Sequence, residues 1–233
     1  FVFDQLVSYF LFAALLAYIH SQSEATLMKP KALLKENTLN FIALPLTVLL
    51  LLASLYWVNL KPIMANTSLI DALSLLQSSP TDNALVVSKF KRSYNLSRLG
   101  RPETVEQIAT NAERILSSSL STTEKNDFYN FAKNAVVRQA SEASGDARYE
   151  IIAGSFLAKT NSIDEGIQHL RRAQELIPGK QLVYFELGSS LITRGDNQEA
   201  LGVFRKAFEL APGYAEAKLI YLVGAIYAGD KNL

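Results

Sequence analysis

Cysteine is absent from the 233 residues of this sequence, and histidine occurs only twice, as His20 and His169. The lack of thiols excludes disulfide frameworks, thiolate zinc sites, iron–sulfur clusters and cysteine nucleophiles. Two histidines are too few for an all-histidine metal site. The sequence also contains no Walker A, GxGxxG, HExxH or GxSxG motif. We therefore expect no cofactor and no metal, and we assign no catalytic residue.

An excess of charge of one sign is missing as well. The sequence has 23 lysines and arginines against 22 aspartates and glutamates, a formal net charge of +1. A protein that binds nucleic acid usually carries a strongly basic surface, so we expect no nucleic-acid partner. Charge is scarcest in residues 1–60, which hold three lysines, no arginine and three acidic residues. The rest of the chain has the composition of a water-soluble protein.

Two long apolar runs account for the scarcity of charge near the start of the sequence. Residues 1–19 read FVFDQLVSYFLFAALLAYI, and residues 39–60 contain no charge at all. A helix needs about 20 apolar residues to cross a bilayer core of about 30 Å. We predict two transmembrane helices, 1–19 and 39–60, and a lipid bilayer as a partner. The alternative for the second run is a buried helix of a soluble protein.

The distribution of lysines predicts a topology. The short basic loop 20–38 contains Lys29, Lys31 and Lys35, whereas residues 61–80 contain only Lys61 as a basic residue. Positive residues in short loops favour the cytoplasmic side of the membrane. We therefore expect a multi-pass protein of the cytoplasmic membrane, with the loop 20–38 inside the cell and the C-terminal part extracytoplasmic.

From residue 61 onward the pattern is helical. Apolar residues recur at helical spacing, and Gly, Pro and Ser clusters mark the ends of the helices at 100–102, 117–123 and 144–146. We interpret 61–146 as a helical connector. An alternative for 122–146 is the second helix of a degenerate repeat.

An internal repeat with a period of 34 residues is the most informative feature of the sequence. Residues 147–180 and 181–214 are two copies, and 215–233 begins a third, truncated copy. Such a period indicates stacked helix hairpins, each of which buries its apolar faces against its neighbours. The repeat-defining residues are Gly154, Ala173 and Pro178 in the first copy and Tyr184, Leu187, Gly188, Ala200, Phe204, Ala207 and Pro212 in the second.

These residues resemble the pattern of the tetratricopeptide repeat (TPR). The first copy departs from that pattern at two positions, where Glu150 replaces an aromatic residue and Gly166 replaces an alanine. We predict an all-α fold in which two transmembrane helices precede an α-solenoid of TPR hairpins, with the TPR domain at 147–233. The truncated last copy should leave the C-terminal end of the array uncapped, so we expect it to fray or self-associate.

The resemblance implies a groove along the first helices of the repeats. Its usual geometry places ten residues in that groove: Arg148, Ile151, Ser155, Ala158, Lys159, Leu182, Phe185, Ser189, Ile192 and Thr193. This surface is mixed apolar with little charge and suits a protein or peptide partner. The alternatives are packing against the chain's own N-terminal helices and packing against a further repeat after the truncated one. His169, beside two arginines in the second helix of a repeat, is expected on a solvated face.

The whole sequence has a second resemblance. The opening string FVFDQLVSY, the charge-free span and the appended repeats resemble the C-terminal end of bacterial O-antigen ligase/polymerase-like membrane proteins. The resemblance implies a parent glycosyltransferase that acts on undecaprenyl-linked glycans at the outer face of the inner membrane. No residue here matches that family's catalytic positions, so this chain would be a non-catalytic fragment, open at both ends. The alternative is a stand-alone membrane-anchored adaptor that assembles a protein complex.

Overall fold

The computed structural model describes residues 2–22, 39–78 and 82–230. Helices make up the regular structure of these ranges, and no strand occurs within them. The predicted all-α fold is therefore confirmed for this part of the chain. The chain divides into two compact units, and the boundary lies between Ala53 and Ser54.

The first unit contains α1 (Val2–Gln22), the π-helical turn η1 (Leu39–Ala43) and most of α3 (Leu44–Ser54). Residues 23–38, which include the three lysines of the predicted basic loop, lie outside the described residues. Within the described ranges, one helix is long and apolar enough to cross a membrane, Phe41–Gln77. Two transmembrane helices are thus not confirmed, and the span predicted at 1–19 stays a prediction.

Two π-helical turns widen the helix Phe41–Gln77, and each ends shortly before a proline. The turn η1 ends at Ala43, two residues before Pro45, and η2 (Leu55–Leu60) ends two residues before Pro62. Proline has no N–H, and its ring collides with the carbonyl four residues earlier. A local π turn relieves that collision without ending the helix.

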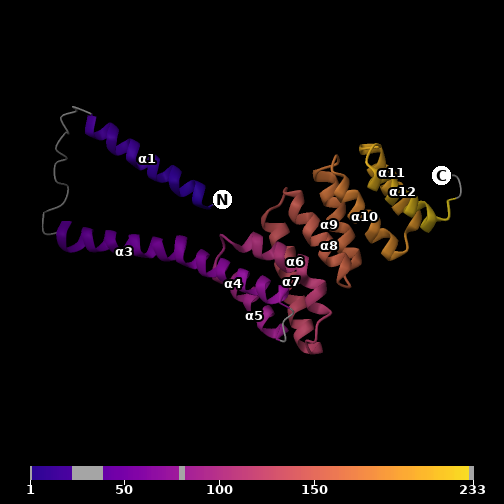
Figure 1. The fold of residues 1–233 in the computed structure, drawn as a ribbon, viewed down its shortest axis with the longest axis horizontal. Helices are drawn as coiled ribbons and strands as arrows, with labels where there is room; N and C mark the ends of the chain where they lie inside the picture. The colour runs from indigo at the N-terminus through magenta and orange to yellow at the C-terminus, as the bar shows by residue number, and fades with distance from the viewer. Residues whose placement is uncertain (1, 23–38, 79–81, 231–233) are drawn as a thin grey trace. The chain divides into compact units, whose positions relative to one another are not determined.

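The second unit is a series of helix hairpins, in which each helix packs against the next one in the chain (Figure 1). After η2, its helices are α4 (Lys61–Gln77), α5 (Asn83–Leu96), α6 (Arg101–Leu116), α7 (Thr122–Glu142), α8 (Ala147–Lys159), α9 (Ile163–Leu176), α10 (Gln181–Arg194), α11 (Asn197–Leu210) and α12 (Ala215–Ala228). The stretch 61–146, interpreted above as a connector, forms the hairpins α4/α5 and α6/α7. The helix α7 is the second helix of such a hairpin.

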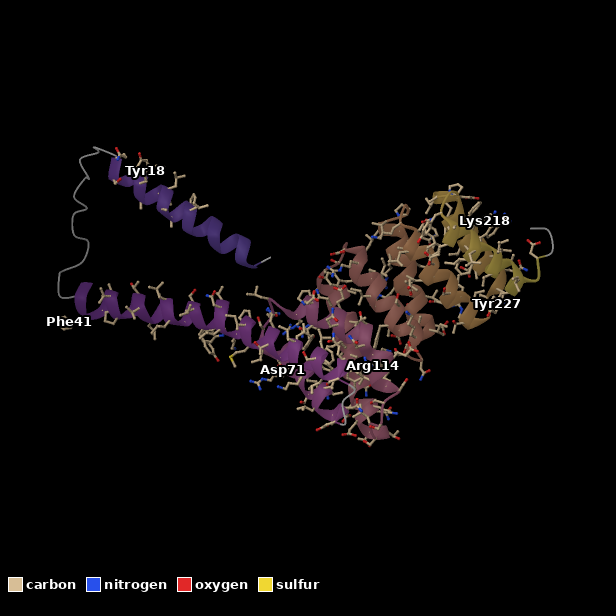
Figure 2. The ribbon with its side chains drawn as sticks, in the orientation of Figure 1. Tyr18, Phe41, Asp71, Arg114, Lys218 and Tyr227 are labelled. Carbon is tan, nitrogen blue, oxygen red and sulfur yellow. The ribbon has the colours of Figure 1, made fainter. Side chains whose placement is uncertain are left out.

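Polar side chains hold these first hairpins together. The Lys89 ammonium of α5 lies 2.6 Å from the Asp71 carboxylate of α4. The Arg114 guanidinium of α6 donates to the Leu76 carbonyl at the end of α4, at 2.5 Å. Figure 2 labels Asp71 and Arg114 among the side chains of this region. The second contact satisfies one of the carbonyls that the end of a helix leaves free.

Local sequence sets the ends of several helices. Asp82 and Asp146 cap α5 and α8, because their carboxylates accept hydrogen bonds from the amides of Leu85 and Arg148, both at 2.9 Å. Ser121 begins α7 with a capping box that includes Glu124. Such caps satisfy amides that have no partner within the helix.

The interior of the second unit has two buried apolar clusters. One extends from α4 to α8 and the other from α9 to α12. Between them, α8 and α9 approach each other through glycines: a Cβ at Gly154 would lie 2.9 Å from the Gly166 carbonyl, and one at Gly166 would lie 2.7 Å from the Gly154 carbonyl. Gly166 thus replaces the alanine of the repeat pattern because the backbones touch here.

In the next hairpin the position of Gly154 is again a glycine, Gly188, and the position of Gly166 is Ala200. The Phe204 ring fills the space between α10, α11 and α12, so a Cβ at Gly188 would lie 2.3 Å from its Cε1 atom, and one at Gly224 would lie 2.6 Å from its Cδ2 atom. Tyr184 is buried and its hydroxyl donates to the Pro178 carbonyl at 2.7 Å. Other repeat-defining side chains in the core are Ala173, Leu187, Ala200 and Ala207. Pro178 and Pro212 follow the C-terminal ends of α9 and α11.

The structure corrects the expectation for His169. Its imidazole does not lie on a solvated face, because Nδ1 is 2.6 Å from Oε2 of Glu150 and only 12% of the side chain is exposed. Glu150, which stands at an aromatic position of the repeat, is buried in the same contact. The pair therefore fills the space between α8 and α9 that apolar side chains would otherwise occupy.

The last helix of the array has an exposed apolar face. Leu219, Ile226 and Tyr227 of α12 are 61%, 77% and 57% exposed, and Figure 2 labels Tyr227 and Lys218 on this helix. The helix ends at Gly229, whose φ of 68° is left-handed. Whether this end frays or self-associates stays a prediction.

Candidate functional site

The candidate site is a pocket of about 260 Å³ between α6 and α8, the first helices of successive hairpins. We call it the groove pocket. Its apolar lining comes from both helices and consists of Ala109, Ala112, Ile151, Ile152 and Phe156. Its polar lining consists of Thr110, Glu113, Ser155, Lys159 and Thr160. A site with an apolar lining and a few polar groups suits a side chain of a protein or peptide partner.

Three of the residues predicted to line a groove lie in this pocket, namely Ile151, Ser155 and Lys159. The Ser155 hydroxyl donates to Oε2 of Glu186, on α10, at 2.8 Å. The Lys159 ammonium lies 4.0 Å from the same carboxylate oxygen, and 60% of its side chain is exposed. Glu186 therefore fixes one wall of the pocket while Lys159 stays accessible.

The other predicted groove residues have different surroundings. Arg148 pairs with Glu106 of α6, and its guanidinium also lies 5.9 Å from the Tyr149 ring centroid. On α10, Phe185 is half-buried and Ser189 is exposed, whereas Ile192 packs against the second apolar cluster. The structure thus does not unite all the predicted residues in one pocket.

Sequence reasoning missed seven of the ten residues that line the groove pocket. The α6 side, with Ala109, Thr110 and Glu113, belongs to a hairpin that the 34-residue period does not reach. Glu186 was also missed, because it does not stand at one of the repeat positions that the usual geometry places in the groove. The helical spacing of the apolar residues in 101–116 predicts a helix there, but it does not show that this helix is a first helix of the array.

A second pocket of about 530 Å³ adjoins the groove pocket at the end of the helices, where the hairpin turns lie. The two pockets share Glu113, Lys159 and Thr160. We call the second one the loop-end basin. Its further lining residues are Leu116, Ser117, Lys125, Asn126, Tyr129 and Asn161.

Polar contacts from α7 fix the α9 side of this basin. The Tyr129 hydroxyl lies 2.6 Å from the Ser162 hydroxyl, and the Lys133 ammonium lies 2.7 Å from the Glu165 carboxylate. The hydrogen bond to Glu165 raises the pKa of Lys133 above its ordinary value, although partial burial opposes the shift. Lys133 therefore stays charged and holds the start of α9 against α7.

The second unit is a series of paired helices, and from α8 onward these pairs have a 34-residue spacing and close glycine contacts. It is therefore a helical-repeat solenoid of the TPR type. A crystal structure of MamA has a similar fold. It is 16% identical, with a TM-score of 0.50, and the match covers 69% of this chain and 86% of MamA.

Two further solved structures are similar. A second MamA crystal structure is 15% identical over 72% of this chain and 85% of its own, with a TM-score of 0.48. YrrB, described as a TPR protein with an unusual peptide-binding site, is 18% identical over 76% of this chain and 83% of its own, with a TM-score of 0.47. No protein-family model and no curated protein matches the chain significantly. Sequence identities this low show a similarity of fold alone.

Proposed function

We propose that this chain is a membrane-anchored interaction scaffold, whose TPR array binds a protein or peptide partner along the first helices of its hairpins. The groove pocket carries the proposal. It joins apolar side chains of α6 and α8, among them the half-buried Ile151 and Ile152, to accessible polar groups such as Thr110 and Lys159.

Site-specific photo-crosslinking tests the scaffold function. A benzophenone amino acid is placed at Thr110 or Lys159, which are exposed beside the pocket, and as a control at Glu175, which is exposed on α9. We expect the two groove positions, but not the control, to give a discrete crosslinked protein in cells that express the chain. Equal crosslinking from all three positions would contradict a groove-directed partner.

The membrane anchor of the proposal is the helix Phe41–Gln77, whose apolar side chains such as Leu50 and Leu51 are more than 60% exposed. Flotation with phosphatidylcholine vesicles tests it. We expect the chain to float and the double variant Leu50→Arg, Leu51→Arg to sediment, because each arginine costs about 3 kcal/mol at the centre of a span. Leu219→Arg on α12, at a similarly exposed position, is the control that should still float.

For the location of the array we propose the extracytoplasmic side of a bacterial inner membrane, as the lysines of the loop 20–38 suggest. Because the chain has no cysteine, single cysteines can be introduced without background. We expect an impermeant maleimide to label Lys180→Cys in intact spheroplasts and to label Lys29→Cys only after lysis. The reverse pattern would place the array in the cytoplasm.

For the parent protein we propose an O-antigen ligase/polymerase-like glycosyltransferase acting on undecaprenyl-linked glycans, with this chain as its non-catalytic C-terminal part. The opening string FVFDQLVSY supports this proposal. A stand-alone membrane-anchored adaptor is the second candidate. The DNA upstream of the Phe1 codon decides between them: many further apolar spans with a long external loop support the first, and a start codon within a few codons supports the second.

A further inference from the structure

The groove pocket and the loop-end basin form one site with two chemically different ends. The groove pocket is mainly apolar, with Phe156 and Ile152 in its lining. The basin is mainly polar and is lined by residues of α7 and of the turn between α8 and α9. They meet at Glu113, Lys159 and Thr160. A ligand that reaches from one to the other must therefore carry an apolar and a polar group close together.

The turn between α8 and α9 departs from the repeat pattern at the basin. Asn161 has a left-handed backbone with φ of 66°, and the equivalent positions in the next two copies are Gly195 and Gly229, with φ of 98° and 68°. Glycine adopts this conformation without strain, whereas any other residue is less favourable there. Asn161 replaces that glycine where its side chain lines the basin, so the turn adds an amide to the site.

The charges of the basin favour an acidic ligand. Lys125 and Lys159 line it together with a single acid, Glu113. Within the ranges that the structure describes, Lys125 forms no ion pair, and Lys159 has only the 4.0 Å contact with Glu186. The ammonium groups and the amides of Asn126 and Asn161 are hydrogen-bond donors. Donors of this kind bind a carboxylate through charge-assisted hydrogen bonds.

We propose that this site binds a peptide segment of the partner in which an apolar side chain lies within a few residues of an acidic side chain. The apolar side chain occupies the groove pocket between α6 and α8. The carboxylate occupies the loop-end basin between Lys125 and Lys159, with Asn161 as a further donor. This inference rests on the proposed function and specifies the chemistry of the partner at that site.

A peptide selection tests the inference. The full chain, solubilised in a mild detergent, is used to select binders from a phage-displayed library of random 12-residue peptides. We expect the selected peptides to be enriched in Asp or Glu within four positions of Leu, Ile or Phe. The affinity of individual synthetic peptides is then measured by fluorescence anisotropy at low and at high salt, because salt screens exposed charges.

Variants of the chain locate the binding site. We expect Lys125→Gln combined with Lys159→Gln to weaken binding by about tenfold, as the loss of two charged donors implies. Asn161→Gly, which restores the residue of the other two copies, should weaken it by about threefold, as the loss of one donor implies. The control is Lys206→Gln combined with Lys218→Gln, which removes two exposed lysines from α11 and α12 and should leave the affinity unchanged.

The outcomes separate this inference from the proposed function. Peptides without acidic enrichment, or peptides whose affinity the basin variants do not change, would overturn the inference and leave the scaffold function standing. A selection that yields no binding peptide, together with no groove-specific photo-crosslink, would overturn both.

Discussion

Glu150 and His169 form a pair between α8 and α9, with 2.6 Å between Oε2 and Nδ1 and only 10% and 12% of their side chains exposed. In the next copy of the repeat the same two positions hold Tyr184 and Val203. Both positions of the pair therefore hold different residues in the two copies. The first copy packs this space with a polar contact and the second with apolar side chains.

The pair predicts a coupled effect on stability. His169→Val leaves the buried Glu150 carboxylate without its partner and should lower the free energy of unfolding by about 1–3 kcal/mol. Glu150→Gln, which can still accept a hydrogen bond from the ring, should cost less. The double variant Glu150→Tyr, His169→Val, which copies the second repeat, should recover part of the loss. Urea unfolding followed by circular dichroism measures all three, and strictly additive losses would refute the coupling.

Gly188 predicts the effect of close packing against Phe204. A Cβ at this position would lie 2.3 Å from the ring, so Gly188→Ala should lower the free energy of unfolding by about 1–3 kcal/mol. Gly202, on the same hairpin, has no atom within 4 Å of its added Cβ. Gly202→Ala should therefore raise stability by about 0.5–1 kcal/mol. The same urea titration tests both variants, and a loss at Gly202 as large as at Gly188 would contradict the packing argument.

The left-handed turns predict opposite effects of two substitutions. Asn161→Gly relieves the backbone at φ of 66° and should keep or raise stability, by up to about 1 kcal/mol. Gly195→Ala introduces a Cβ at φ of 98° and should lower stability by about 1–2 kcal/mol. Thermal unfolding compares the two, and a destabilised Asn161→Gly chain would indicate that this side chain supports the fold rather than the basin.

The capping box of α7 predicts a pH dependence. The Ser121 hydroxyl and amide donate to Oε2 of Glu124 at 2.7 and 2.9 Å, and the hydroxyl is the main cause that lowers the pKa of Glu124. A lowered pKa in the folded state means that the contact adds stability above the unfolded-state pKa. That stability is lost as the pH falls through the pKa of Glu124 in the folded state.

An NMR titration of the side-chain carboxyl carbons measures this effect. Ser121→Ala should raise the midpoint of Glu124 towards that of an ordinary glutamate. Glu142 at the other end of α7 is the internal control, because its pKa is lowered mainly by the hydrogen bond from Arg138 and should not change. A Glu124 midpoint that is the same in both chains would show that the Ser121 hydroxyl has no part in the shift.

The hairpins from 147 to 214 could be predicted from sequence because their signals are local and repeated. Gly154, Ala173 and Pro178 recur 34 residues later as Gly188, Ala207 and Pro212, and the two prolines mark the ends of the second helices. The hairpins α4/α5 and α6/α7 lack that period, since α7 alone has 21 residues. Their helices could be predicted from apolar spacing, but their place in the array could not, because stacking depends on contacts between distant segments.

The candidate site was predicted only in part for the same reason. The positions of Ile151, Ser155 and Lys159 on one helix face follow from helical periodicity. The opposite wall comes from α6, about 40 residues earlier in the chain, and no local pattern links it to α8. Asn161 could have been found by aligning it with Gly195, because a glycine position filled by another residue is visible in the sequence.

The sequence by itself determined helicity, the register of the repeats and the apolar run of 39–60, because these depend on the spacing of residue types along the chain. Tertiary structure decided which side chains meet: Glu150 with His169, Ser155 with Glu186, and the lysines of the loop-end basin with Asn161. Glu150 and His169, Ser155 and Glu186, and Lys125 and Asn161 come from different elements of the fold. Their proximity follows from how closely the helices pack, which glycines such as Gly154 and Gly166 set through backbone contact.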